Sequence, residues 1–169
     1  MDAPFIYDKY VTGKNFIGRK DDCTLLGKLL AQGTHVAIYE PPQTGKKSLV
    51  HQTLFNLKIS GKQFSVGEFS LLNVRHTDTF LIKYGSAAIK AFASTPEEYS
   101  DIITKYLSET HFIFDPDLYS DKDQIISTNG NIELNDIQHM LWLPHLLAKD
   151  KGQQLILAID EFQNIDFIE

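Results

Sequence analysis

The sequence predicts a three-layer α/β fold with a mainly parallel sheet, and three observations predict it. Short apolar runs that suit buried strands alternate along the chain with amphipathic patterns that suit helices. One such run, residues 36–39, leads through a turn into Gly45-Lys46 at the start of a helical pattern. Another run, residues 155–159, ends in the acidic pair Asp160-Glu161. Strands that alternate with helices in this way usually form parallel sheets covered by helices.

The composition indicates one globular domain and excludes several classes of protein. The chain has 169 residues, of which 43 % are hydrophobic and 22 % charged, so it can bury a sizeable core. A net charge of −6 argues against a protein that binds nucleic acid through a basic surface. The single cysteine, Cys23, cannot form an internal disulfide, and no apolar stretch has the length of a membrane span. We therefore expect a cytoplasmic protein in which Cys23 is a buried or half-buried apolar residue of a helix.

The chain is expected to begin with an irregular arm, residues 1–15, followed by one domain, residues 16–169. The first helix is predicted over residues 20–32, where leucines recur at three- and four-residue spacing, and Gly33 ends it. Residues 36–39 are predicted to be a buried strand, because four apolar residues lie between turn signals.

A second helix is predicted from Gly45 to about residue 58, followed by a strand over residues 64–72 that Gly67 weakens. The next helix is predicted over residues 77–93, with Thr77 or Asp78 as its N-cap. Another helix should run to residue 107 from Thr95-Pro96, because these residues suit the N-cap and the first helical position.

Residues 110–133 are rich in aspartate and are predicted to form a solvated loop with a small hairpin that turns at Asn129-Gly130. A calcium loop is the alternative, but the glycine and the terminal glutamate of an EF-hand are missing. A helix is then predicted over residues 134–149, which Pro144 should kink or divide. Its inward-facing residues are expected to be Ile137, Leu141 and Leu147, and Trp142 is expected to be a core or packing residue.

Residues 40–48 have the layout of a phosphate-binding loop, Gly-x-x-x-x-Gly-Lys-[Ser/Thr]. In such a loop, backbone N–H groups and the positive end of the following helix converge on the phosphates, which the lysine also reaches. Lys46 is the candidate phosphate lysine and the candidate catalytic cation. The candidate backbone donors are those of Gln43, Thr44, Gly45, Lys46, Lys47 and Ser48.

Two residues depart from this pattern. Glu40 stands where the first glycine belongs, and it places a carboxylate close to the phosphates. Lys47 stands where a hydroxyl should bind Mg²⁺, and a lysine cannot coordinate a metal, although its charge could replace that of the metal or pair with Glu40. We therefore expect weakened nucleotide binding that does not depend on Mg²⁺, and impaired hydrolysis.

The acidic pair after residues 155–159 is the second candidate element. Ligands bind at the carboxyl ends of the strands in open α/β sheets, where these two side chains would lie. Asp160 is predicted to orient Mg²⁺ and its waters, and Glu161 to act as the general base toward an attacking water. The alternative for each acid is an ordinary solvated strand end.

These segments together resemble the prokaryotic AAA/STAND-type P-loop ATPases. Phe16-Ile17-Gly18-Arg19, a short helix and then the phosphate loop are similar to the start of that domain, and residues 155–163 are similar to its Walker B strand. The resemblance covers residues 16–58 and 153–164. It implies a three-layer P-loop NTPase fold with ATP as the cofactor, and it places Phe16, Ile17 and Arg19 near the adenine.

The resemblance also implies a domain that is truncated after Walker B. In such ATPases a strand that comes later in sequence lies between the Walker A and Walker B strands, and these 169 residues end before it. The sheet is therefore expected to show a gap, a strand from another chain, or a Walker B strand displaced onto the P-loop strand.

Two functions remain open from the sequence. The first is the ATP-binding domain of such an ATPase, with weak or impaired hydrolysis. The second is a pseudo-ATPase that serves as a structural or protein-interaction module, through self-association or a partner protein. Lys46, Asp160 and Glu161 favour the first function, whereas Glu40 and Lys47 favour the second.

Overall fold

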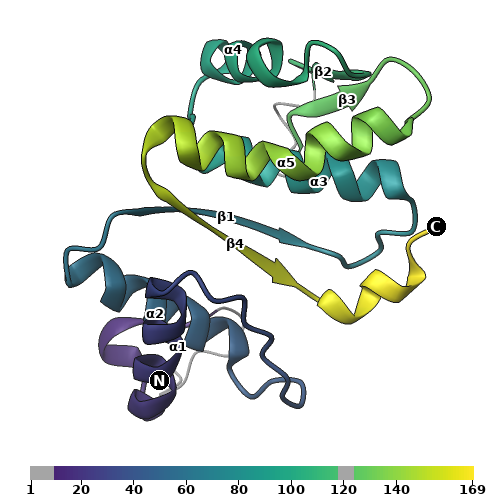
Figure 1. Ribbon diagram of the computed structural model, residues 1–169. Coiled ribbons are helices and arrows are strands. Elements are labelled where there is room, and N and C mark those ends of the chain that lie inside the picture. Colours follow the sequence, from purple (N-terminus) through teal and green to yellow (C-terminus); the bar gives the residue numbers. More distant parts are fainter. Residues whose placement is uncertain (1–9, 118–123) are drawn as a thin grey trace. The chain divides into compact units, whose positions relative to one another are not determined.

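The computed structural model describes residues 10–117 and 124–169 of a mixed α/β chain (Figure 1). The chain divides into two compact units, Met1–Gln63 and Phe64–Glu169, and each is described by itself. Most of the predicted N-terminal arm and the centre of the acidic loop lie outside the described residues.

The first unit is built on two helices, α1 (Lys20–Ala31) and α2 (Lys46–Ile59), after a short 3-10 turn, η1 (Gly13–Asn15). Both helices lie within about one residue of their predicted bounds. A small apolar cluster joins them. Its buried members are Cys23, Leu26 and Leu49, and Phe16, Leu30, Ile38 and Val50 pack against it partly buried. The prediction of a buried Cys23 is therefore confirmed.

The predicted strand over residues 36–39 is wrong, because these residues form no strand. Only Ile38 packs into the apolar cluster, whereas Val36 is 38 % exposed and Tyr39 is 99 % exposed. An apolar tetrapeptide becomes a strand only when a neighbouring strand pairs with its backbone groups. The segment is irregular chain that connects α1 to the loop before α2.

The second unit contains a parallel strand pair, β1 (Phe64–Ser70) and β4 (Gln154–Asp160). Phe64 lies opposite Gln154 and Ser70 opposite Asp160, and in the described part of the chain this sheet has two strands. Parallel strands need a long crossover. Here it contains α3 (Thr77–Lys90), α4 (Pro96–Leu107), β2 (Phe112–Phe114), β3 (Ile126–Thr128) and α5 (Leu134–Lys151).

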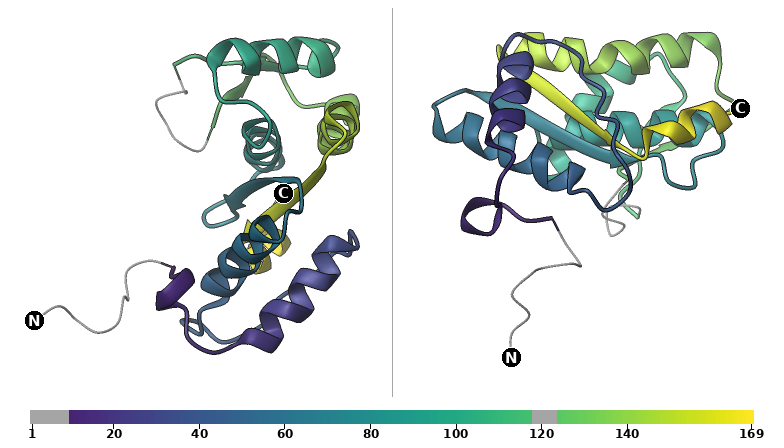
Figure 2. Two further views of the ribbon diagram at one scale, coloured as in Figure 1. Left: turned by 90° about the vertical axis from the view of Figure 1, so that its left-hand side faces the viewer. Right: turned by 90° about the horizontal axis from the view of Figure 1, so that it is seen from below.

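The main core of the second unit lies where α3 and α5 run side by side over the strand pair (Figure 2). Leu81, Ile89, Met140 and Leu143 are at most 1 % exposed there. Leu155 and Leu157 of β4 pack against this core. Gly67 of β1 lies against the backbone of α3 at Ala87, and this close approach explains a glycine inside a strand.

Three predictions in this unit concern helix N-caps and a hairpin turn. One of them is right and two are wrong. Thr95 caps α4 in a capping box with Glu98, as its sequence indicated. The N-cap of α3 is His76, and its side chain makes no capping hydrogen bond. Asn129-Gly130 is no hairpin turn, because β3 pairs antiparallel with β2, which comes earlier in the chain.

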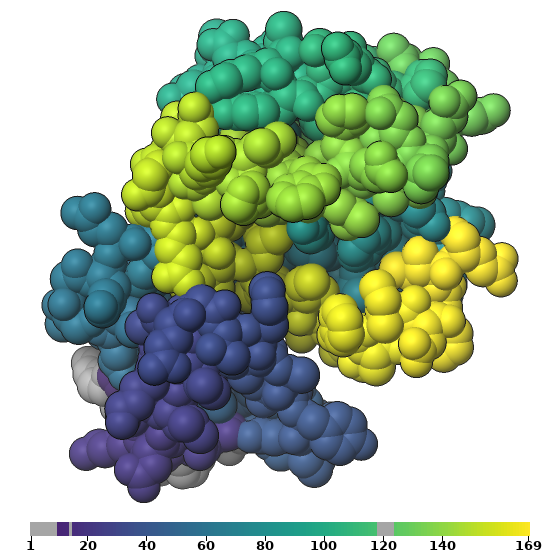
Figure 3. Space-filling view, viewed as in Figure 1, coloured from purple at the N-terminus to yellow at the C-terminus, as the bar shows by residue number. Residues whose placement is uncertain are grey.

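Helix α5 also differs from its prediction, since it runs undivided through Pro144. Leu147 is buried and Ile137 packs against the core, but Leu141 is 47 % exposed and Trp142 is 61 % exposed. The residues directly before and after this exposed pair, Met140 and Leu143, are the buried ones. The outer side of α5 is visible along the surface in the space-filling view (Figure 3). No helix among the described residues is long and apolar enough to cross a membrane.

A buried carboxylate ties the β2–β3 pair to α5. Asp136, which is 1 % exposed, accepts the N–H of Glu133 at 2.7 Å and the N–H of His111 at 2.8 Å. The Nδ1 atom of His111 lies 3.0 Å from the same carboxylate. This hydrogen bond raises the pKa of His111. Burial alone would raise the pKa of Asp136, but the bonds from Glu133 and His111 outweigh burial and lower it.

The His111–Asp136 pair predicts a pH dependence of stability. Because the folded-state pKa of His111 is raised, its contribution is complete below the unfolded-state value of about 6.5 and is lost as the pH rises through the folded-state pKa. We expect His111→Gln to destabilise the protein more at pH 5.5 than at pH 8.5 in urea unfolding. His139→Gln, which replaces a histidine outside this pair, is the control. An equal loss at both pH values for His111→Gln would contradict the ion pair.

Candidate functional site

The candidate phosphate loop lies in the first unit, between the irregular segment of residues 36–39 and α2. Pro41 and Pro42 hold its first half out of a helical conformation. Gln43 and Gly45 then take left-handed backbone conformations, with φ of +63° and +84°, and Gly45 is the N-cap of α2. The loop therefore turns sharply enough to place Lys46 in the first turn of the helix.

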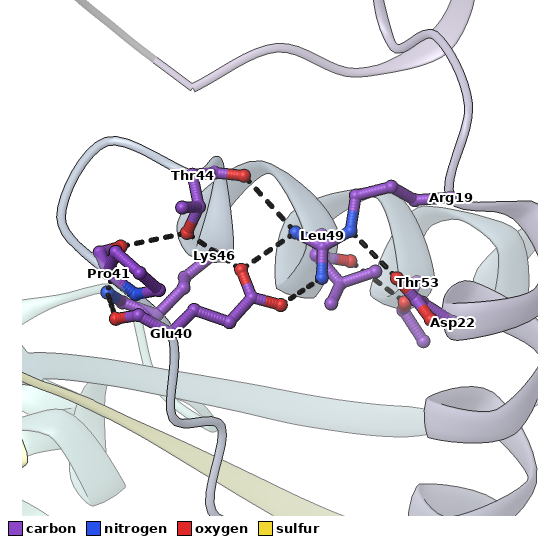
Figure 4. A network of polar contacts seen from close by, with 8 residues as sticks. All are labelled: Arg19, Asp22, Glu40, Pro41, Thr44, Lys46, Leu49 and Thr53. Carbon is purple, nitrogen blue, oxygen red and sulfur yellow. Dashed lines mark hydrogen bonds and ion pairs between the residues drawn. The ribbon is translucent and has the colours of Figure 1, made fainter.

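The side chain of Lys46 folds back into this loop (Figure 4). Its Nζ donates to the carbonyl oxygen of Glu40 at 2.8 Å and to that of Pro41 at 3.1 Å. The ammonium is thus held by main-chain oxygens and not by a carboxylate. A lysine held in this way can exchange its carbonyl partners for the oxygens of an anion without breaking an ion pair.

Glu40 is neutralised by Arg19, which is also the N-cap residue of α1. The guanidinium meets both carboxylate oxygens, with Nη2 on Oε1 and Nη1 at 3.1 Å from Oε2. The hydroxyl of Thr44 lies 2.7 Å from Oε2 of Glu40 and 2.9 Å from the carbonyl oxygen of Pro41, so it can donate its hydrogen bond to only one of them at a time. The hydrogen bond from Arg19, followed by that from Thr44, lowers the pKa of Glu40.

Arg19 has two further contacts that fix its direction. Its Nε donates to Asp22 Oδ2 at 2.8 Å, one turn along α1, and Nη1 also lies 3.2 Å from the carbonyl oxygen of Thr44. The hydrogen bonds to Glu40 and then to Asp22 raise the pKa of Arg19. The guanidinium therefore reaches from the start of α1 into the candidate phosphate loop.

The structure gives Glu40 a different partner from the one that the sequence suggested. Pairing with Lys47 was one expectation, but Glu40 forms its ion pair with Arg19, 21 residues away in sequence. Lys47 is exposed in the first turn of α2. Arg19 was expected near an adenine, and here its guanidinium lies at the loop.

Ser48 binds the N-terminal arm. Its Oγ accepts the N–H of Val11 at 3.0 Å, and Gln52, one turn later, accepts the N–H of Gly13 at 2.6 Å. The ring of Tyr10 stacks on His51 with 3.7 Å between centroids. The described part of the arm is thus laid along α2, and no sequence pattern indicated these contacts.

Of the other candidates for base contact, Phe16 is partly buried in the apolar cluster of the first unit. Ile17 is 83 % exposed. Of these two residues, Ile17 therefore offers the larger apolar surface to a ligand in this arrangement.

Asp160 and Glu161 lie in the second unit, at the carboxyl end of β4, and both are exposed. The N–H of Glu161 donates to Asp160 Oδ1 at 3.0 Å. Glu161 has a left-handed conformation with φ of +54° and begins a 3-10 helix, η3 (Phe162–Phe167). Gln163 Nε2 donates to Glu161 Oε2 at 2.6 Å. The two acids therefore project from a tight turn directly after the strand.

Residues 10–117 and 124–169 contain no group of three or more His, Cys, Asp or Glu side chains placed to hold a metal ion. No protein family, curated protein or solved structure matches this chain significantly.

Proposed function

We propose that this chain is the ATP-binding part of an AAA/STAND-like P-loop ATPase with weak or impaired hydrolysis. The observation that supports the proposal is the position of Lys46, whose ammonium is held inside the loop by two carbonyl oxygens at the N-terminus of α2. The first N–H groups of a helix have no acceptor within the helix and favour an anion. An ammonium group beside a helix N-terminus therefore forms a positive site that suits a phosphate chain.

The three-layer P-loop architecture is part of this proposal. A parallel strand pair with helices α3 and α5 packed against it, and an acidic pair at the carboxyl end of β4, are compatible with such a sheet. In the proposed ATPase, Asp160 would orient Mg²⁺ and its waters, and Glu161 would accept a proton from the attacking water. Mg²⁺ has a weaker role than in other P-loop proteins, because Lys47 supplies no hydroxyl.

The second candidate function is a pseudo-ATPase that serves as a structural or protein-interaction module. The ion pair of Glu40 with Arg19 favours it, because a carboxylate inside the loop opposes the binding of phosphate. The two functions make opposite predictions for nucleotide binding, and one pair of variants separates them.

Lys46→Met is expected to weaken ATP binding about 10- to 100-fold, because a charge-assisted hydrogen bond contributes about 1.5–3 kcal/mol. The measurement is isothermal titration calorimetry, with Mg²⁺ and with EDTA. Lys58→Met is the matched control, since it removes the same charge from the same helix about 18 Å from Lys46. Similar affinities in wild type and Lys46→Met, or no binding to either, would favour the pseudo-ATPase.

A further inference from the structure

We propose that Glu40 is an internal competitor of the phosphate chain, and that a polyphosphate binds by displacing the Glu40 carboxylate from Arg19. This inference rests on the proposed function and adds a regulatory contact to the same loop. The wild-type loop is then self-inhibited by its own carboxylate, and its anion affinity is set by the Arg19–Glu40 pair.

The contact of Arg19 with Glu40 has the form that an arginine uses for a phosphate. Nη1 and Nη2 each meet one carboxylate oxygen. Carboxylate and phosphate groups present a similar pair of oxygens to the guanidinium fork. The side chains of Arg19 and Glu40 are 26 % and 25 % exposed. A ligand can therefore reach the pair from solvent, although most of the surface of the two side chains is covered by protein.

Arg19 would keep its direction after leaving Glu40. Its Nε remains bound to Asp22 and its Nη1 lies at the carbonyl oxygen of Thr44, so two of its contacts do not depend on the Glu40 carboxylate. The exchange therefore costs one ion pair and does not require the arginine to be repositioned. This distinguishes Arg19 from an exposed arginine that must lose its conformational freedom on binding.

Arg19 and Lys46 both contact Glu40. Arg19 binds the side chain of Glu40, while Lys46 binds its main-chain oxygen. Thr44 adds a third donor near the same carboxylate. A chain of two or more phosphates can engage the arginine and the lysine together, and so the ligand class is a polyphosphate, such as the phosphate chain of a nucleotide, without bound metal.

The test compares Glu40→Gln with Asp22→Asn. Each variant removes one negative charge from a partner of Arg19, but only Glu40 lies in the loop. The probes are inorganic tripolyphosphate and ATP, both in EDTA, and affinity is measured by isothermal titration calorimetry. We expect Glu40→Gln to raise both affinities roughly tenfold, since the ion pair with Arg19 is replaced by a hydrogen bond to an uncharged amide oxygen, and Asp22→Asn to raise them clearly less.

Equal gains in the two variants would show a general effect of charge and would overturn the inference. No gain in Glu40→Gln, with wild-type binding that Lys46→Met weakens as expected, would overturn the inference and leave the proposed function standing. No binding to any variant would remove both. Glu40→Ala is the second variant if Glu40→Gln does not fold by circular dichroism, and the same gain is expected from it.

Discussion

Replacing Gly67 with alanine should destabilise the second unit by about 3 kcal/mol or more, the upper end of overpacking effects. A β-carbon at this position would overlap the carbonyl oxygen of Ala87 in α3 and would lie 2.8 Å from Leu157 Cδ2. The obstacle is helix backbone, which moves only if α3 shifts as a whole. Because α3 also packs on α5, such a shift opens the main core.

Gly85→Ala is the matched control for this prediction. Its β-carbon would overlap Met140 Sδ and lie 3.0 Å from Met140 Cε, and a flexible methionine side chain can adapt more easily than a carbonyl group. Urea unfolding, followed by circular dichroism and by the fluorescence of Trp142, the single tryptophan, compares the two variants. Equal losses would mean that α3 does not approach β1 as closely as this geometry requires.

Sequence patterns placed the helices well because their signals are local. The leucine spacing of α1, the Gly45-Lys46 start of α2 and the Thr95 capping box each depend on residues within a few positions. Each signal is a pattern of residues close together in sequence, so no knowledge of the remaining chain was needed to recognise it. The apolar run of β4 also predicted a strand correctly.

Strand pairing and side-chain partners could not be predicted in this way, because they are set over long distances in sequence. Residues 36–39 have the composition of a strand but form none. Strand β3 pairs with β2, which precedes it in the chain, and not with a segment after Asn129-Gly130. The outward position of Trp142 follows from the rotation of α5 on α3, which its mixed pattern did not determine.

In the candidate site, too, local features could be predicted from the sequence and long-range partners could not. The loop and Lys46 were predicted from the spacing of a motif. The pairing of Arg19 with Glu40 joins residues 21 positions apart, and no motif marks it. The only sequence signal was Glu40 itself, a carboxylate where the motif of the candidate loop has a glycine. A carboxylate at that position calls for a neutralising cation, but the sequence does not identify which one.

If the chain is the proposed ATPase, Glu161→Gln is expected to lower ATP turnover about 10²- to 10⁴-fold, the usual contribution of a general base, while ATP affinity changes less than about twofold. A base acts on the attacking water in the transition state, and so its loss reduces the rate without weakening ground-state binding. Glutamine keeps the side-chain length and an oxygen that can accept the bond from Gln163, so the turn after β4 should remain intact.

The measurement is single-turnover hydrolysis of radiolabelled ATP by excess protein, which detects very slow reactions, together with calorimetric affinity. Asp166→Asn is the control, because it removes an exposed acid from the same 3-10 helix. Parallel losses of affinity and turnover would make Glu161 a structural or metal-binding residue. If Glu161→Gln and Asp166→Asn both turn over ATP at the wild-type rate, Glu161 is not the base, and its left-handed position serves only to begin the turn.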